Sequence, residues 1–399
     1  MANTILTPTA VTREALRVLH QKLKFVGSIN RQYDDSYARS GAKIGDSLKI
    51  RLPNQFTIRS GATLSAQDVT ESSVTLQLAT QKGVDVNFTS AELTLSLDDF
   101  SARILKPAMA VLAANIEADA LAMVKDVYNF IDGDAAAPTF LQLLQAKQKL
   151  DENLAPEGED RSVQLIPTHS AKIIDALKGL FNDQRALGQQ YKDGVLGKTA
   201  DFDFYQNTLL PSSQATGTSA KTTVYLSNGV AQTGASIAVD TGANTFKKGD
   251  VITFAGTNAA HAETKADLGY LQQFVLTADY AGGAGSVAID PAVTATGAKQ
   301  NVTAAIADNS AVVKVGAGAS ETYVQSLLYH KDAFAIAFAD LLDVSEFGAW
   351  GARQVMDGIS MRIARQYDIT NDKFPCRIDV FYGFKAIRPQ LACRLHADG

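Results

Sequence analysis

The side chains that most often perform catalysis or bind metals are scattered along this chain, and their spacing assembles no known site. The histidines form no His-x-x-x-His pair and have no cysteine at ligand spacing; they are His20, His169, His261, His330 and His396. A lone histidine is more often structural than catalytic. We therefore predict no metal site, and we expect His330 to cap or pack at the turn that Lys331 begins.

Two other patterns resemble catalytic motifs only superficially. Gly194-x-x-Gly197-Lys198 lacks the spacing and the Ser or Thr of a phosphate-binding loop. The carboxylate pairs Asp34-Asp35 and Asp98-Asp99 are sequence neighbours that point in different directions, and acids in a first helical turn usually act as caps. There is no Gly-x-Ser-x-Gly nucleophile elbow. These observations predict a protein that is not an enzyme and that uses no cofactor.

Cysteine usage and hydropathy restrict the cellular setting. Cys376 and Cys393 are too few for a disulfide framework in 399 residues, so we expect reduced thiols. No apolar run approaches the roughly 18 residues of a membrane span. The N-terminal residues lack a positive region followed by an apolar core, so no signal peptide is expected. The sequence thus predicts synthesis in the cytoplasm and no membrane partner.

Charge is distributed unevenly along the chain. The formal net charge is −5, which argues against a dedicated nucleic-acid-binding protein. Residues 1–60 hold ten Lys or Arg and four acids, so this segment is +6 and the remainder is −11. A basic segment on an acidic body can dock onto acidic neighbours or subunits, or it can be a solvated helix face. Both interpretations stay open.

The periodicity of the first 155 residues predicts two long features. Apolar residues alternate with polar ones within residues 44–89, which predicts two strands joined by a long polar tip. The tip, residues 55–73, has too little apolar content to pack on its own domain. An apolar stripe at steps of three and four predicts a helix from Asp98 to Phe130, roughly 32 residues or about 48 Å long, with Pro107 near its start. The stripe comprises Leu105, Met109, Leu112, Ile116, Ala120, Met123 and Val127.

The other predicted elements are shorter. An amphipathic helix is expected over Thr9–Val26 and another over Thr139–Leu154. A buried strand at Val163–Pro167 leads to a helix that Ser170 caps and that runs to Phe181. Further strands are predicted at Asp201–Pro211, at Gln325–Ala337 (leading directly into the start of a helix), and at residues 359–369 and 376–384.

A segment of different composition interrupts this mixed α/β sequence. No arginine occurs between Arg185 and Arg353, and from Ser212 to Ala319 the residues Ala, Gly, Thr, Ser and Val dominate. Short strand candidates separated by turns predict a small antiparallel barrel or sandwich. Examples are Thr222–Leu226, Ser236–Val239, Val251–Phe254, Leu271–Thr277 and Val287–Ile289.

The order of these elements resembles the major capsid protein of tailed double-stranded-DNA phages. The glycine turn Gly194–Gly197 with the following strand to Pro211, the motif Leu328–Phe334 and the segment Cys376–Pro389 are similar to that family's axial-domain and final-strand motifs. Lys248–Gly256 resembles part of the β-barrel insertion domain of the short-tailed Salmonella-phage coat type. The stretch between Pro211 and Lys247 is shorter than in that type, so a charged loop that crosses two-fold contacts there is expected to be missing.

The resemblance implies an α+β phage major-capsid fold with an inserted antiparallel β-barrel. The implied parts are an N-terminal arm (1–43), an extended hairpin loop (44–90), a peripheral domain with a spine helix (91–155), an axial domain with returning peripheral strands (156–211 and 319–399) and the insertion domain (212–318).

The resemblance also implies the function: self-assembly into an icosahedral shell that encloses phage DNA. The implied partners are copies of this chain in hexamers and pentamers, a scaffolding protein, a portal, and double-stranded DNA bound without sequence specificity. The implied location is the virion. Candidate contacts between subunits are the hairpin charges Arg51, Arg59, Asp68 and Glu71, and Arg13 and Arg17 of the arm.

Three alternatives to a phage capsid protein stay open. An encapsulin-type compartment shares the host fold but encloses enzymes instead of DNA. The β-rich segment 212–318 alone suggests an adhesin or carbohydrate-binding protein, although it contains few aromatic residues. An enzyme of unrecognised type is the remaining alternative, and no residues converge to support it.

Overall fold

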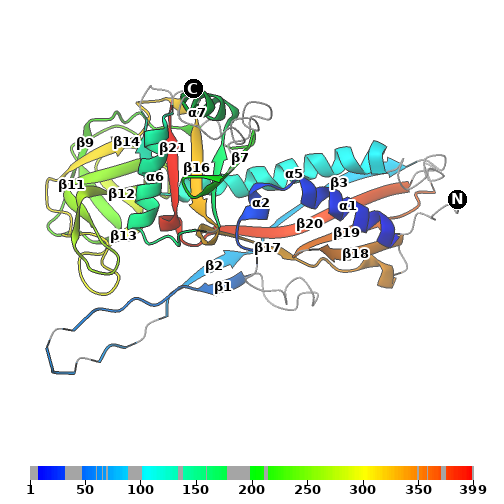
Figure 1. Ribbon diagram of the computed structural model, residues 1–399, viewed down its shortest axis with the longest axis horizontal. Coiled ribbons are helices and arrows are strands. Elements are labelled where there is room, and N and C mark those ends of the chain that lie inside the picture. The colour runs from blue at the N-terminus through cyan, green and yellow to red at the C-terminus, as the bar shows by residue number, and fades with distance from the viewer. Residues whose placement is uncertain are drawn as a thin grey trace. The chain divides into compact units, whose positions relative to one another are not determined.

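The chain forms two compact units in a computed structural model (Figure 1). The structure describes residues 8–31, 47–59, 61–64, 66–68, 71–88, 101–133, 138–158, 160–177, 198–210, 214–347, 350–356, 358–369 and 374–397. The first unit comprises Met1–Arg51, Ser73–Leu121 and Phe334–Ile387, and the second comprises Leu52–Ser72, Ala122–Ala333 and Arg388–Gly399.

An antiparallel sheet covered by helices forms the first unit. The long strand β20 (Phe374–Ala386) pairs with β3 (Thr80–Phe88) and β17 (Phe334–Ala339), and with β19 (Ile359–Arg365), which in turn pairs with β18 (Trp350–Met356). Helix α1 (Pro8–Lys22) packs against β18 and against α5 (Lys106–Leu121). A short helix, α2 (Phe25–Ser28), follows α1. The carboxylate of Glu117 on α5, which is buried, accepts a 2.7 Å hydrogen bond from the backbone N–H of Phe25.

The predicted spine helix is present but differs in its bounds. It comprises a π-helical turn (Ser101–Leu105), α5, and a 3₁₀ turn (Ala122–Asp126). All seven residues of the predicted stripe are buried. Pro107 is the second residue of α5, directly after the π-helical turn. The expected end at Phe130 was wrong, because Phe130–Asp132 forms strand β4 and pairs with the last strand of the chain.

The same helix also contradicts the expectation that no apolar run reaches membrane length. Arg103–Asp126 has 24 residues and a mean hydropathy of 1.4 in its most apolar window, so it passes by length and composition. Half of that window is buried inside the protein.

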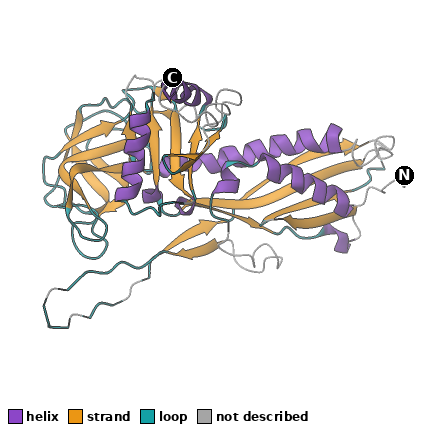
Figure 2. Ribbon diagram, viewed as in Figure 1, coloured by secondary structure: helices purple, strands orange, loops and turns teal. Residues whose placement is uncertain are grey.

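The second unit contains a six-stranded sheet, which we call the host sheet because the inserted segment interrupts it in the sequence. Its order is β4-β21-β16-β5-β7-β6. The bounds are β5 Arg161–Leu165, β6 Lys198–Thr199, β7 Phe202–Gln206, β16 Gln325–His330 and β21 Ala392–His396. Helix α6 (Phe140–Glu152) packs against β21 (Figure 2), and its first turn is closed by a capping box between Thr139 and Gln142.

Two of the helix predictions for this part of the chain were wrong. Helix α7 (Pro167–Leu177) begins at Pro167 because proline suits a first helical turn, so Ser170 lies inside the helix and does not cap it. No helix follows β16. A 3₁₀ turn (Lys331–Ala333) leads directly into β17, whose long-range pairing with β20 replaces the expected helix. His330 does cap this turn, because its Nδ1 accepts the N–H of Asp332 at 3.3 Å.

A closed antiparallel barrel interrupts this host sheet in the sequence. The strands follow the order β10-β13-β12-β11-β14-β9, and β9 pairs with both β10 and β14 to close it. Their bounds are β9 Thr223–Ser227, β10 Gly234–Asp240, β11 Val251–Ala260, β12 Asp267–Leu276, β13 Gly285–Val293 and β14 Ala311–Val315. The barrel prediction is confirmed, and β14 is the strand that its examples did not include. The interior is filled by apolar side chains, including Tyr225, Phe246, Phe254 and Phe274.

Candidate assembly surfaces

The hairpin that was predicted between residues 44 and 89 carries three large apolar side chains that are exposed to solvent. Strands β1 (Ser47–Arg51) and β2 (Ser73–Gln77) pair antiparallel, and Leu52 N–H donates to Ser72 O at 2.8 Å. Beyond this bond, Phe56, Ile58 and Leu64 are 59%, 96% and 82% exposed. Side chains of this size are usually covered in a folded protein, so this tip has the character of a contact surface.

The predicted hairpin charges are exposed, and one of them is used within the loop itself. The Arg59 guanidinium donates to Gly61 O and, at 3.2 Å, to Thr63 O. Asp68 and Glu71 lie on the returning arm, and Arg51 ends β1. Pairing of these charges between subunits stays a prediction.

The N-terminal charges lie on the outer face of α1. Its other face is buried through Val11, Leu16 and Leu19. Arg13 is exposed, and Arg17 forms a 2.7 Å ion pair with Glu14 one helical turn earlier. That hydrogen bond raises the pKa of Arg17. This part of the arm is therefore a packed amphipathic helix whose charges face solvent.

A second candidate surface is the junction between the barrel and the host sheet of the second unit. Its apolar centre joins Tyr128 and Phe130 of the host to Val251 and Val275 of the barrel, with Ala317 and Tyr323. The Gln273 side chain of β12 hydrogen-bonds the backbone of β4 in the way that a neighbouring strand would. Its Oε1 accepts Phe130 N–H at 2.8 Å, and its Nε2 donates to Phe130 O at 2.9 Å.

Buried charges surround this apolar centre. Arg394 is fully buried, donates to Gly249 O at 3.0 Å and lies 5.1 Å from the centre of the Phe130 ring. Burial lowers the pKa of Arg394 and raises the pKa of Asp250, which accepts the N–H groups of Lys247 (2.8 Å) and Gly217 (3.1 Å).

The last strand of the barrel is fastened at the same junction. Lys314, whose pKa burial lowers, donates to Gly318 O at 2.6 Å, where the chain leaves the barrel. The short strands β8 (Gln214–Ala215) and β15 (Thr322–Tyr323) pair just outside it. Both connections between barrel and host are thus fixed by hydrogen bonds.

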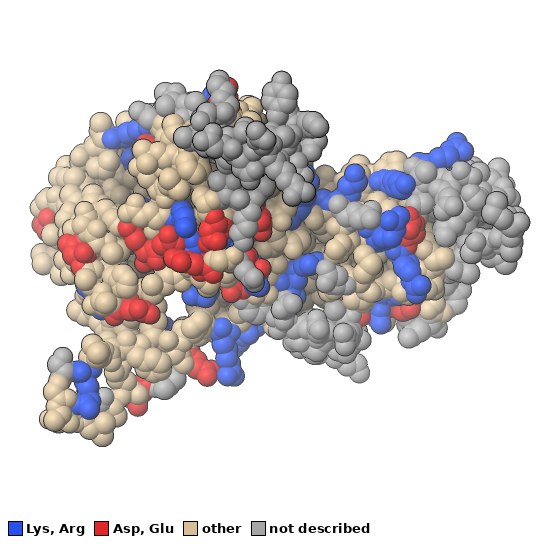
Figure 3. Space-filling view, in the orientation of Figure 1, with Lys and Arg blue, Asp and Glu red and all other residues tan. Residues whose placement is uncertain are grey.

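Charged contacts extend this junction toward solvent. Lys248 pairs with Asp126 at 3.2 Å, and Asp132 accepts Lys221 at 3.0 Å and His396 Nδ1 at 3.1 Å. Away from these contacts, most of the barrel surface visible in Figure 3 carries neither acidic nor basic side chains. This agrees with the few charges of the inserted segment.

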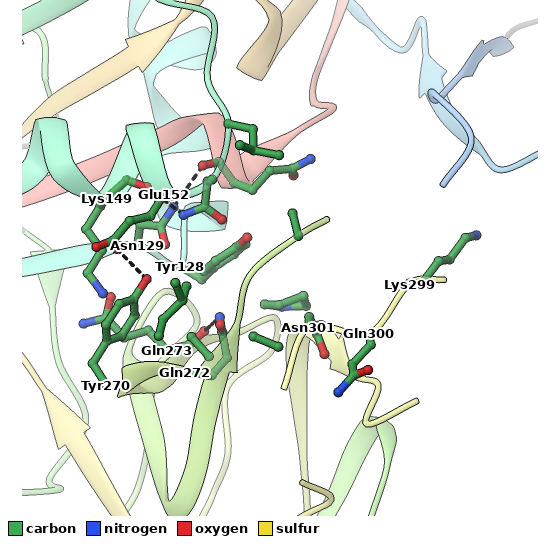
Figure 4. A pocket seen from close by; sticks show the side chains of 18 of the residues that line it. Tyr128, Asn129, Lys149, Glu152, Tyr270, Gln272, Gln273, Lys299, Gln300 and Asn301 are labelled. Atoms are coloured by element: carbon green, nitrogen blue, oxygen red, sulfur yellow. Dashed lines mark hydrogen bonds between the residues drawn. The ribbon is translucent and has the colours of Figure 1, made fainter. Parts of the chain in front are cut away.

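A polar cavity of about 270 Å³ lies beside the junction, between α6 and the barrel (Figure 4). The Tyr270 hydroxyl donates to Glu152 Oε2 at 2.7 Å, and Lys149 Nζ lies 3.3 Å from the centre of the Tyr270 ring. Burial raises the pKa of Tyr270 and lowers the pKa of Lys149. The tyrosine stays neutral at physiological pH, so these groups act as a structural contact between helix and barrel.

Two of the histidines have structural partners. His169 bonds Ser326 Oγ at 2.8 Å and Ala397 O at 3.0 Å, and His261 Nδ1 accepts two backbone N–H groups. Burial raises the pKa of each cysteine thiol, Cys376 and Cys393, to about 12. Within the described ranges, no group of three or more His, Cys, Asp or Glu residues is placed to hold a metal ion. The glycine turn 194–197 and the pairs Asp34-Asp35 and Asp98-Asp99 lie outside these ranges.

The junction residues were not anticipated from the sequence. Arg394 offered one signal, because it is a single cation in the apolar run Leu391–Leu395. Gln273 and Tyr270 offered none, since their partners are far away in sequence.

A family model and several solved structures are similar to this chain. The family model described as "P22 coat protein - gene protein 5" matches residues 32–394. No curated protein matches the chain. A solved structure from Mycobacterium phage Che8 is 12% identical, with a TM-score of 0.47, and the alignment covers 94% of this chain and 90% of that one.

Two further solved structures are capsids. The capsid of the cyanophage P-SCSP1u is 12% identical (TM-score 0.46; 92% and 88% covered), and that of Ralstonia phage GP4 is 10% identical (TM-score 0.44; 92% and 86% covered). The family match favours neither the encapsulin-type compartment nor the adhesin. This chain belongs to the P22 coat protein family, and it is a major capsid protein, a structural component of the phage virion.

Proposed function

We propose that this capsid protein assembles through its hairpin, with Leu52–Ser72 of each subunit binding a neighbouring subunit. The observation that carries this proposal is the exposure of Phe56, Ile58 and Leu64 on one loop. Burying these side chains against another copy would remove apolar surface from water at many equivalent contacts in a closed shell. Pairing of Arg51 or Arg59 with Asp68 or Glu71 across subunits would add about 0–1 kcal/mol each, since such pairs are exposed.

The domain assignment is part of the same proposal. We assign 1–43 to the arm, 44–90 to the hairpin loop, 91–155 to the peripheral domain, 156–211 and 319–399 to the axial domain with returning strands, and 212–318 to the insertion domain. The pairing of β8 with β15 supports the limits of the insertion. The two compact units divide the chain elsewhere, at Leu121 and on either side of Phe334–Ile387.

The proposed partners are other copies in hexamers and pentamers, a scaffolding protein, a portal, and double-stranded DNA enclosed without sequence-specific contacts. A net charge of −5 suits a container that does not grip its DNA. We expect synthesis in the cytoplasm of the bacterial host, with Arg13 and Arg17 available to acidic neighbours.

The test replaces Phe56, Ile58 and Leu64 with serine and compares shell yield by sedimentation and negative-stain microscopy. We expect folded, soluble subunits with at least about tenfold fewer shells. The control is Val230→Ser, which removes an apolar side chain of similar exposure (84%) from the barrel and should leave the yield unchanged. Deletion of residues 55–72 should likewise leave a folded subunit that forms no shells. Normal shells from the deletion would refute the role of the hairpin.

A further inference from the structure

The inner backbone edge of the first hairpin arm is hydrogen-bonded to the returning arm. All residues of Pro53–Arg59 are exposed, and the arm runs extended in Figure 1. Thr57 N–H donates to Gln67 Oε1 at 2.9 Å, and Gln67 Nε2 donates back to Thr57 O. The side-chain amide of Gln67 therefore replaces a partner strand on the inner side of the arm, which faces the returning arm.

Phe56 and Ile58 present their backbone groups on the opposite side. In an extended chain, the N–H and C=O groups of successive residues point to alternate edges. Within the part of the chain that the structure describes, no hydrogen bond satisfies the backbone groups of these two residues. The side chains of Phe56 and Ile58 also share one face of the arm. The arm therefore has the features of a strand that is ready to join a sheet.

Most sheet edges of the described chain do not suit such a strand. The barrel is closed, and the end strands of the six-stranded sheet, β4 and β6, have three and two residues. Strand β18 has seven residues, and the segment that precedes it covers one face, because a Cβ on Gly351 would lie 2.4 Å from Val344 Cγ2. Arg353 also reaches Leu341 O at 3.4 Å.

Among the described strands, β3 offers the longest open edge. It has nine residues, and it pairs with β20 from Thr80 to Phe88. No other described backbone group is bonded to its outer side. Val84 and Val86 are half-buried on one face, and the exposed carboxylate of Asp85 lies on the other. An edge strand of this kind is the usual receiver of an added strand.

We propose that β3 of one subunit accepts the segment Gln55–Ile58 of a second copy of this chain as an added β-strand. This inference rests on the proposed function, in which the hairpin contacts a neighbour, and it names the receiving surface. Phe56 and Ile58 then lie beside Val84 and Val86. Arg59, which follows the added strand, is opposite in charge to Asp85 on the receiving strand.

Disulfide crosslinking in assembled shells tests the pairing. Ile58→Cys and Phe56→Cys are each combined with Val84→Cys, and the shells are oxidised near pH 8. The natural thiols are buried with pKa values of about 12, so they contribute no background. We expect a ladder of covalent multimers on a non-reducing gel from at least one pair. The matched control, Thr57→Cys with Val84→Cys, places the first thiol on the opposite face and should give no ladder.

Several outcomes overturn the pairing. They are no ladder from either pair, an equally strong ladder from the Thr57 control, or covalent dimers from Ile58→Cys alone, which would show that two hairpins pair with each other. An intrachain link without multimers also overturns it.

Hydrogen–deuterium exchange on the natural chain gives an independent test if the cysteine variants fail to assemble. On assembly, peptides covering 53–59 and 80–88 should both exchange at least tenfold more slowly, and unchanged exchange in either one overturns the pairing. Shells that need the hairpin but leave β3 unprotected refute only this inference. Shells that form without residues 55–72 refute the proposed function itself.

Discussion

Gln273 provides a sharp test of how the barrel is attached to the host sheet. Its amide makes two hydrogen bonds to the backbone of Phe130, a buried residue. Gln273→Leu keeps the size of the side chain but leaves the Phe130 N–H and C=O unpaired and shielded from water. An unsatisfied buried polar group costs about 1–3 kcal/mol. The Phe130 N–H and C=O are two such groups, and Gln273 is only half-buried. We therefore expect the free energy of unfolding to fall by the lower part of their sum, about 2–4 kcal/mol.

The assay is urea denaturation of the full-length subunit, followed by circular dichroism. The matched control is Gln272→Leu, because that neighbouring amide donates only to Gln273 O, at 2.8 Å. Its loss should cost about 1 kcal/mol or less. If Gln273→Leu is as stable as the natural chain, or no less stable than the Gln272 variant, the amide of Gln273 does not support β4 and the reasoning fails.

Two further predictions concern the same unit. Gly316→Ala should lower the free energy of unfolding by about 1–3 kcal/mol, because φ is +99° and a Cβ would lie 2.9 Å from the Phe130 ring. The control Gly297→Ala measures the backbone strain alone, because φ there is +86° and a Cβ would meet no other atom. An equal loss of stability in both variants would show that the contact with the Phe130 ring is unimportant. Burial lowers the pKa of His169, so its contribution to stability is present above the ordinary pKa of about 6.5 and is lost as pH falls below it. The melting temperature of the natural chain should therefore drop more between pH 7.5 and 5.5 than that of His169→Gln, and parallel curves for the two proteins would contradict the assignment.

Periodicity predicted the elements whose packing repeats along the chain. The stripe from Leu105 to Val127 is buried throughout, and the alternating apolar residues within 44–89 formed β1, β2 and β3. The change of composition at Ser212 predicted the barrel because small and β-branched residues suit short, tightly turned strands.

The errors arose where distant partners decide the local structure. Phe334–Ala339 contains three alanines, which suit a helix, but its register with β20 makes it a strand. The helix expected to reach Phe130 ends earlier because that residue joins β21. Local propensity contains no information about such partners.

The two candidate surfaces differ in how far the sequence predicts them. The polar composition of residues 55–73 predicted that the hairpin tip would not pack on its own domain, but nothing predicted the junction. The contacts of Gln273 with Phe130 and of Arg394 with Gly249 join residues 143 and 145 positions apart, so no spacing rule reveals them.

The strand order of the host sheet has a consequence for synthesis on the ribosome. Strands β4 and β5 emerge early, but the two strands that lie between them, β21 and β16, belong to the last part of the chain. All six barrel strands are translated before β16 begins, and their pairing needs no later residue. A nascent chain can therefore complete its barrel before the central strands of the host sheet, β16 and β21, have been made. A truncated product would contain a folded barrel, but its host strands would have unpaired edges that promote aggregation.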